Sequence, residues 1–139
     1  MPNIVFTTDQ APAALGPYSQ AVRAGDLIFC SCLFGLDPVS GALVSGGVVA
    51  ETGRMLANLR AVIEASGASL ADVSRTTLYL AEMADFPAVN QVYATFFKIA
   101  PPARTTIQAV LPKGARVGID AIACVPSAKS AAQTHASGT

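Results

Sequence analysis

Apolar and polar residues alternate along the first part of the chain in a way that predicts short strands. Residues 4–7 are β-prone, and the stretch 9–20 follows them with two prolines and a glycine, which predicts a loop. Two further β-prone runs flank Gly25-Asp26, and this composition is typical of a hairpin turn. A second stretch rich in turn-forming residues, 36–47, separates this region from the next.

The periodicity changes from two to between three and four at Val48. Apolar residues recur at three- and four-residue steps as far as Gly67, which predicts an amphipathic helix. Residues 72–80 return to a strand-like pattern. Asp85 then stands where a helix N-cap is expected, ahead of a second apolar stripe. This stripe consists of Phe86, Val89, Tyr93, Phe96 and Phe97.

The segment 101–124 is the most sheet-like of the chain, and we interpret it as two strands joined by a Pro-Lys-Gly turn. Arg104 opens the first strand and Asp120 lies inside the second. If the two strands form a hairpin, the two charges share a face only when its register brings them to the same side.

The order of elements is strands, helix, strand, helix and two strands, which indicates an α+β fold. We expect one mixed β-sheet covered on one face by two helices. Residues 27–34 are apolar at nearly every position, so the second face should also be covered, and another subunit is the expected cover. We expect a single domain over 1–126 and a disordered tail over 127–139, which is small, polar and aperiodic.

Composition narrows the function classes. The chain has 139 residues, of which 52% are hydrophobic and 13% charged, with nine Lys and Arg against nine Asp and Glu. Zero net charge without a basic run argues against a nucleic-acid binder and against a ribonuclease. No stretch has the roughly 18 uninterrupted apolar residues of a membrane span, and the N-terminus lacks a secretory pattern. We therefore expect a cytoplasmic protein with no membrane partner.

The three cysteines and the one histidine do not form a metal-binding pattern. Cys30 and Cys32 would share a strand face, where they are poorly placed for a disulfide, and Cys124 is distant in sequence. His135 lies in the polar tail. A zinc site needs several nitrogen or sulfur ligands, so we expect no metal and no cofactor, and we interpret the cysteines as small buried hydrophobes.

Three stretches of the chain together resemble the RidA (YjgF) family. Their most specific parts are Gly16-Pro17-Tyr18, the helix that contains Val89-Asn90, and Pro102-Ala103-Arg104 followed by Leu111-Pro112. The resemblance extends over nearly the whole chain up to Val125. It implies a chorismate-mutase-like (YjgF-like) fold and a homotrimer with a barrel-like core and clefts between subunits. It also implies hydrolysis of reactive enamines and imines, such as 2-aminoacrylate, to 2-keto acids and ammonia.

Two charged residues are the expected catalytic groups. Arg104 resembles the arginine that holds the substrate carboxylate in this family, and a guanidinium suits this task because it binds a carboxylate through two parallel hydrogen bonds. Asp120 stands where the family usually has a glutamate, and it can relay protons to and from an attacking water. The alternative is that Arg104 and Asp120 form a structural ion pair.

Three further residues match positions that the family uses around its ligand. Tyr18 resembles the tyrosine that covers the cleft, although a loop aromatic can equally close the core. Asn90 either braces a loop through hydrogen bonds or is a solvated helix residue. Ser31 either donates to the ligand carboxylate or satisfies the strand backbone.

Other positions depart from the family pattern. Cys32 replaces a glycine that lets the ligand approach, and Leu33 follows it, so the cleft should be narrower. Thr106 replaces a cysteine but can still hydrogen-bond a carboxylate or a water. Asp120 is one methylene shorter than a glutamate. We count Cys32 and Thr106 with the expected substrate-binding residues.

The function that these residues favour is an enamine/imine deaminase of the 2-iminobutanoate/2-iminopropanoate type, acting on a small carboxylate-bearing substrate. A specialised deaminase of an aminomuconate-type substrate is a variant of this hypothesis. The departures from the family pattern favour a second class, a non-catalytic trimer that binds small carboxylates or 2-keto acids as a sensor or a stress-activated holdase.

Overall fold

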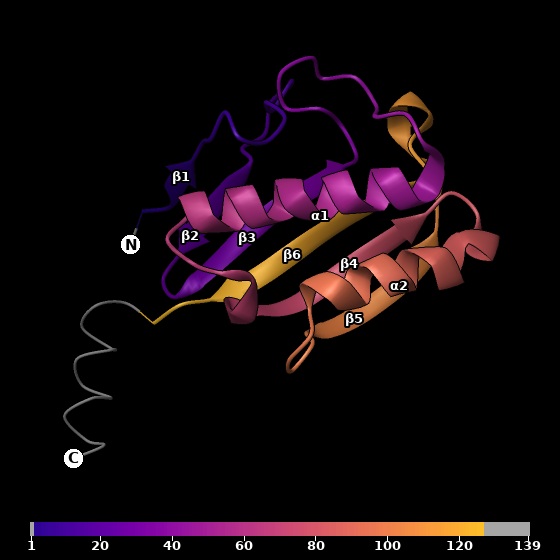
Figure 1. The fold of residues 1–139 in the computed structure, drawn as a ribbon. Coiled ribbons are helices and arrows are strands. Elements are labelled where there is room, and N and C mark those ends of the chain that lie inside the picture. Colours follow the sequence, from indigo (N-terminus) through magenta and orange to yellow (C-terminus); the bar gives the residue numbers. More distant parts are fainter. Residues whose placement is uncertain (1, 127–139) are drawn as a thin grey trace.

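The computed structural model describes residues 2–126 and shows one β-sheet with two helices packed on one of its faces (Figure 1). The expected tail, 127–139, lies outside the described residues. The strands are β1 (Ile4–Phe6), β2 (Ala21–Ala24), β3 (Leu27–Phe34), β4 (Val73–Leu80), β5 (Ala103–Gln108) and β6 (Val117–Cys124). The helices are α1 (Gly47–Ala65) and α2 (Phe86–Phe96), and short 3₁₀ turns are η1 (Leu70–Asp72), η2 (Met83–Asp85) and η3 (Pro112–Gly114).

The sheet has six strands in the order β1-β2-β3-β6-β4-β5. Only β4 and β5 run parallel, and every other neighbouring pair is antiparallel. Helix α1 connects β3 to β4 and α2 connects β4 to β5, and both helices lie on the same face of the sheet (Figure 1). The expected α+β class, the mixed sheet, the β2–β3 hairpin and both helices are therefore confirmed.

The expected hairpin at the end of the chain is wrong. Strand β5 pairs only with β4, and β6 is inserted between β3 and β4 in the middle of the sheet. The Pro-Lys-Gly turn is η3, and it belongs to an eight-residue connection, 109–116, that passes the end of β4. A connection of this length does not force its two strands to be neighbours, whereas a two-residue loop would.

This strand order places the two charges of the segment on opposite faces. Thr76 of β4 lies beside Arg104 of β5, whereas the next residue, Thr77, lies beside Asp120 of β6. Side chains that are neighbours across strands share a face, and successive residues of one strand alternate between faces. Arg104 therefore points to the helix side, and Asp120 points to the other side, which we call the open face.

The hydrophobic core lies between the helices and the sheet. The apolar stripe of α1 packs on residues of β3, β4 and β6 that are almost completely buried, among them Ile28, Leu78 and Ile119. The end of β3 approaches α1 so closely that a Cβ atom on Gly35 would lie 2.6 Å from the backbone oxygen of Glu51. Contact at this distance requires glycine, because neither backbone can move independently of its element.

A β-bulge interrupts the alternation of β3. The register with β6 shifts between Cys30 and Leu33, so both of these side chains are buried in the core. Cys32 and Phe34 then lie on the open face, since a Cβ on Gly118 of β6 would meet both of their side chains. The expectation that Cys30 and Cys32 share a face is therefore wrong, because the bulge adds one residue to the strand.

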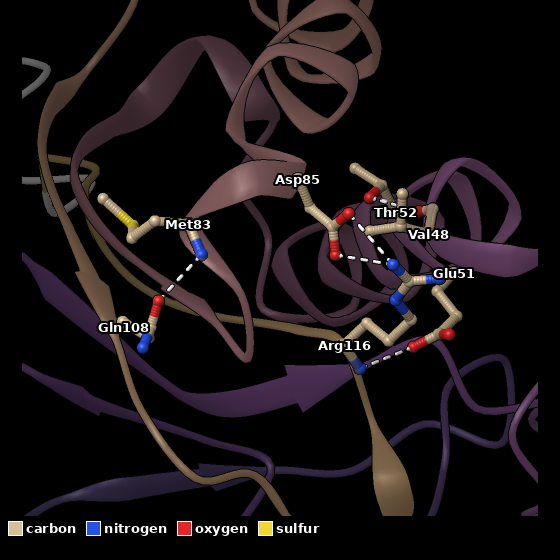
Figure 2. Close-up of polar contacts among 7 residues, drawn as sticks. All are labelled: Val48, Glu51, Thr52, Met83, Asp85, Gln108 and Arg116. Carbon is tan, nitrogen blue, oxygen red and sulfur yellow. Dashed lines mark hydrogen bonds and ion pairs between the residues drawn. The ribbon is translucent and has the colours of Figure 1, made fainter.

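Polar contacts join the beginnings of α1, α2 and β6 (Figure 2). The buried Glu51 accepts a hydrogen bond of 2.8 Å from the backbone N–H of Arg116, and the guanidinium of Arg116 contacts both carboxylate oxygens of Asp85 at 2.9 Å. Asp85 holds the N-cap position of α2 as expected, but its side chain makes no capping bond because Arg116 engages it instead. These contacts fix where β6 enters the sheet.

The close approach at Gly35 leads to a stability prediction. Gly35→Ala should lower the urea midpoint of unfolding by the equivalent of about 1–3 kcal/mol, because the new methyl group overlaps the backbone of α1. Gly53→Ala is the matched control, since a Cβ there meets nothing within 4 Å and an interior helical glycine costs about 1 kcal/mol relative to alanine. Equal midpoints for the two variants at the same protein concentration would contradict the packing described here.

Candidate active site

The first group of expected site residues surrounds Arg104. Its Nη1 donates a hydrogen bond of 2.8 Å to Oδ1 of Asn90, and its guanidinium carbon lies 4.7 Å from the ring centroid of Tyr93 and 5.4 Å from that of Phe86. Thr106 lies two residues further along β5, on the same face of the strand. Asn90 is an exposed residue of α2 that braces the arginine of β5, so the expected bracing of a loop is wrong. We call Asn90, Arg104 and Thr106 the arginine half-site.

Buried contacts beneath this group hold the aromatic support in place. Tyr93 is almost completely buried, and its hydroxyl shares a hydrogen bond of 2.8 Å with the hydroxyl of Thr76 on β4. Burial raises the pKa of the Tyr93 phenol, so the phenol stays neutral beneath the cation. A neutral ring that cannot rotate away gives the guanidinium a fixed cation–π surface.

The second group of expected residues lies around a small pocket at the other side of the sheet. Tyr18 is 53% exposed and lines a cavity of ≈ 50 Å³ together with Ser31, Cys32, Phe34 and Leu36. The Ser31 hydroxyl donates a hydrogen bond of 2.7 Å to the carbonyl oxygen of Ser19, so its proton is engaged by the backbone. This acceptor belongs to the loop before β2, and donation by Ser31 to a ligand carboxylate stays a prediction.

Asp120 lies on the same side as this pocket. Its Oδ2 accepts a hydrogen bond of 2.6 Å from the hydroxyl of Tyr79, and no other residue in 2–126 donates to its carboxylate. The negative charge of Asp120 adds to burial in raising the pKa of the Cys32 thiol to about 12. Cys32 is therefore a neutral thiol at physiological pH. We call Tyr18, Ser31, Cys32 and Asp120 the pocket half-site.

The two half-sites do not meet within one copy of the chain. Arg104 is on β5 at one edge of the sheet and faces the helices, whereas Asp120 is two strands away and faces the opposite direction. An Arg104–Asp120 ion pair within one copy is therefore excluded. One small substrate can contact both half-sites only where the open face of one copy adjoins the β5 edge of another.

The open face has the character of a surface that another chain covers. Its exposed apolar side chains come from three different strands: Val5 from β1, Leu27 and Phe29 from β3, and Ile107 from β5. Exposed apolar side chains that gather on one face are typical of protein interfaces. This agrees with the expectation that a further copy of the chain covers the sheet.

Sequence reasoning missed Tyr79 and the pair formed by Phe34 and Gly118. A Cβ on Gly118 would lie 2.8 Å from the Phe34 ring, so the absence of a side chain there lets Phe34 line the pocket. A glycine inside a strand pattern was the available signal, because it often marks a close approach. The contact of Tyr79 with Asp120 had no signal in the sequence, since it depends on β6 lying beside β4.

Other kinds of site find no support in the described residues. Within 2–126, no three His, Cys, Asp or Glu side chains come together as a metal ion would require. None of the helices in that range is long and apolar enough to cross a membrane. The three cysteines are all free thiols; Cys30 is buried and Cys32 half-buried, but Cys124 is exposed, so the expectation that all three are buried is wrong for Cys124.

The raised pKa of Cys32 predicts low reactivity. In Cys30→Ser/Cys124→Ser, the remaining Cys32 should react with iodoacetamide at pH 8 about a thousandfold more slowly in the native protein than in urea, because about one thiol in ten thousand is ionised when the pKa is about 12. Adding Asp120→Asn should increase the rate at which Cys32 reacts in the native protein, since the charge of Asp120 is, after burial, the largest cause of the raised pKa. Equal rates in native and denatured protein would show that the thiol is neither buried nor influenced by Asp120.

Known proteins match the sequence of this chain over nearly its whole length. Residues 8–125 match the sequence profile of the family described as Endoribonuclease L-PSP. The chain is 50% identical over 120 residues to a Mus musculus protein named 2-iminobutanoate/2-iminopropanoate deaminase, a match that covers 86% of this chain and 89% of that one. A Homo sapiens protein of the same name is 46% identical over 120 residues, covering 86% and 88%.

Solved structures agree with these sequence matches. The YjgF gene product of E. coli has a TM-score of 0.83 at 34% identity, with 87% of this chain and 98% of that chain covered. E. coli TdcF, solved with bound serine, has a TM-score of 0.84 at 33% identity, covering 89% and 99%. The chain therefore belongs to the Endoribonuclease L-PSP family, which is the RidA (YjgF) family that its motifs resemble.

Proposed function

We propose that the protein hydrolyses reactive 2-imino acids to 2-keto acids and ammonia, in clefts formed between copies of the chain. In this proposal Arg104 of one copy holds the substrate carboxylate, and the pocket half-site of a neighbouring copy completes the cleft. The expected assembly is a homotrimer.

The contacts of the Arg104 guanidinium are the observation on which this proposal rests. Its guanidinium is held by one amide oxygen and two aromatic rings, and no carboxylate in residues 2–126 pairs with it. A positioned cation with remaining N–H donors can accept a carboxylate ligand in two parallel hydrogen bonds. Asn90 and the rings fix its orientation in advance, which reduces the entropy that binding would cost.

Relatives with informative names support the choice of chemistry. Two mammalian members at 46–50% identity are named 2-iminobutanoate/2-iminopropanoate deaminase. A structural neighbour binds serine, which carries the same carboxylate beside a substituted carbon as a 2-imino acid. Both fit a cleft whose first requirement is a carboxylate anchor.

The reaction itself needs few protein groups. The water oxygen attacks the carbon of the protonated C=N bond, whose π electrons move to nitrogen, and Asp120 accepts the proton that the water loses. Asp120 then returns this proton to the amino group of the tetrahedral intermediate. The C–N bond breaks as the hydroxyl oxygen forms the carbonyl and its proton passes to Asp120, and ammonia and the 2-keto acid leave. No covalent intermediate with the protein is required.

A non-catalytic carboxylate-binding trimer is the second candidate. One observation favours it: the Ser31 proton and one oxygen of Asp120 are already engaged within the chain, which leaves fewer free polar groups in the pocket half-site. An assay separates the two candidates: an amino acid oxidase generates 2-imino acids in place, and the release of keto acid is measured. Only a deaminase accelerates this release.

Replacing the arginine tests the anchor. Arg104→Ala should reduce kcat/KM about 30-fold to several thousandfold, which corresponds to about 2–5 kcal/mol for a charge-assisted contact in a partly dry cleft. Arg104→Lys should recover only part of this loss, because an ammonium lacks the planar fork. Arg60→Ala is the matched control, since Arg60 also lies over an aromatic ring, at 5.3 Å from the Phe96 centroid, and is in neither half-site. Wild-type kinetics in Arg104→Ala would end the anchor hypothesis.

Mixing two inactive variants tests whether the cleft is shared. Arg104→Ala and Asp120→Asn copies that are refolded together should regain about a quarter of the wild-type activity, because one cleft in four then receives both intact residues. The same variants mixed without subunit exchange should stay inactive. A light-scattering mass for the active species should correspond to a trimer. Absence of recovery in verified mixed trimers would mean that both residues act within one copy or not at all.

A further inference from the structure

The contact between Tyr79 and Asp120 has a geometry that the catalytic role of Asp120 alone does not explain. Tyr79 lies opposite Gly118 across the β4–β6 pair, and Thr77 lies opposite Asp120, so Tyr79 and Asp120 are diagonal neighbours on the open face. Long side chains can span a diagonal of this kind. The phenol does so and donates a hydrogen bond of 2.6 Å to Oδ2.

Phe34 and Cys32 lie beside the pair on the open face. Gly118 has no side chain to separate Tyr79 from its neighbours, and the Phe34 ring and the Cys32 thiol occupy the space above that glycine. The phenol pKa is raised to about 12, chiefly by its hydrogen bond to Asp120, so Tyr79 remains the donor at any physiological pH. Oδ2 is thereby engaged, and Oδ1 receives no hydrogen bond from residues 2–126.

We propose that Tyr79 is a positioning residue for the deaminase reaction, which holds the Asp120 carboxylate by one oxygen and presents the other to the attacking water. This inference rests on the proposed function. An aspartate has one methylene fewer than a glutamate, and the carboxylate of a free side chain can rotate. The phenol removes that rotation, so the proton acceptor is already oriented when the water attacks.

The role assigned to Tyr79 differs from a role in stability or in substrate binding. Within residues 2–126, no hydrogen bond joins Tyr79 to the arginine half-site, so its loss should leave substrate affinity unchanged. Loss of orientation at Asp120 should appear in kcat. Because the phenol acts only through the carboxylate, its effect should vanish once the carboxylate is absent.

The experiment is a double-mutant cycle on the assembled protein, with steady-state kinetics on an imino acid generated in place. Tyr79→Phe keeps the ring and removes the hydroxyl, and it should lower kcat about tenfold or more with KM within about twofold of wild type. Asp120→Asn should lower kcat further. Tyr79→Phe/Asp120→Asn should match Asp120→Asn alone. If Tyr79→Phe does not assemble, Tyr79→Met is the second variant, because it replaces the phenol with a flexible apolar side chain. We expect the same kinetic effect from it.

A control variant separates activity from stability. Ser66→Ala removes a buried hydroxyl that donates to the Val62 carbonyl oxygen at the end of α1, away from both half-sites, and it should change the melting temperature without changing kcat. Wild-type kcat in Tyr79→Phe, beside a strongly lowered kcat in Asp120→Asn, would overturn the inference and leave the proposed function intact. Additive losses in the double variant would also overturn it. An inactive wild-type protein would overturn the proposed function, and the inference with it.

Discussion

The position of β6 between β3 and β4 is the constraint on which the rest of the structure depends. This strand forms two long antiparallel pairings, and its inward side chains join the layer that α1 covers. It also separates the two parts of the candidate site: β3 and β6 carry Cys32 and Asp120 on the open face, whereas β5 carries Arg104 on the helix face. The contacts of Glu51, Asp85 and Arg116 hold the beginning of this strand against both helices (Figure 2).

Sequence periodicity predicted the helices and the individual strands because these depend on local spacing. The stripe from Val48 to Ile63 has only one amphipathic solution, and α1 follows it. Strand order was not predictable in the same way, since an eight-residue connection after β5 is compatible with several neighbours. The faces of Arg104 and Asp120 follow from that order, and those of Cys32 and Leu33 follow from a bulge that has no distinct residue pattern.

The candidate site was predictable as a set of residues but not as an arrangement. Motif resemblance identified Arg104, Asn90, Tyr18 and Cys32, and the structure gathers them into two groups. Motif resemblance could not identify the contact of Tyr79 with Asp120, because the two residues are 41 positions apart and meet only through strand pairing. Chemistry that depends on non-local pairing of this kind is visible only once the sheet is known.

The central place of β6 also affects how the protein can be made. This strand is the last element of the described chain, and its two neighbours are synthesised long before it. Until it leaves the ribosome, β3 and β4 have unpaired inner edges, and the apolar face of α1 lacks part of its cover. The sheet of the nascent chain is therefore open at its middle and exposed to aggregation, and this sheet can be completed only after β6 has emerged.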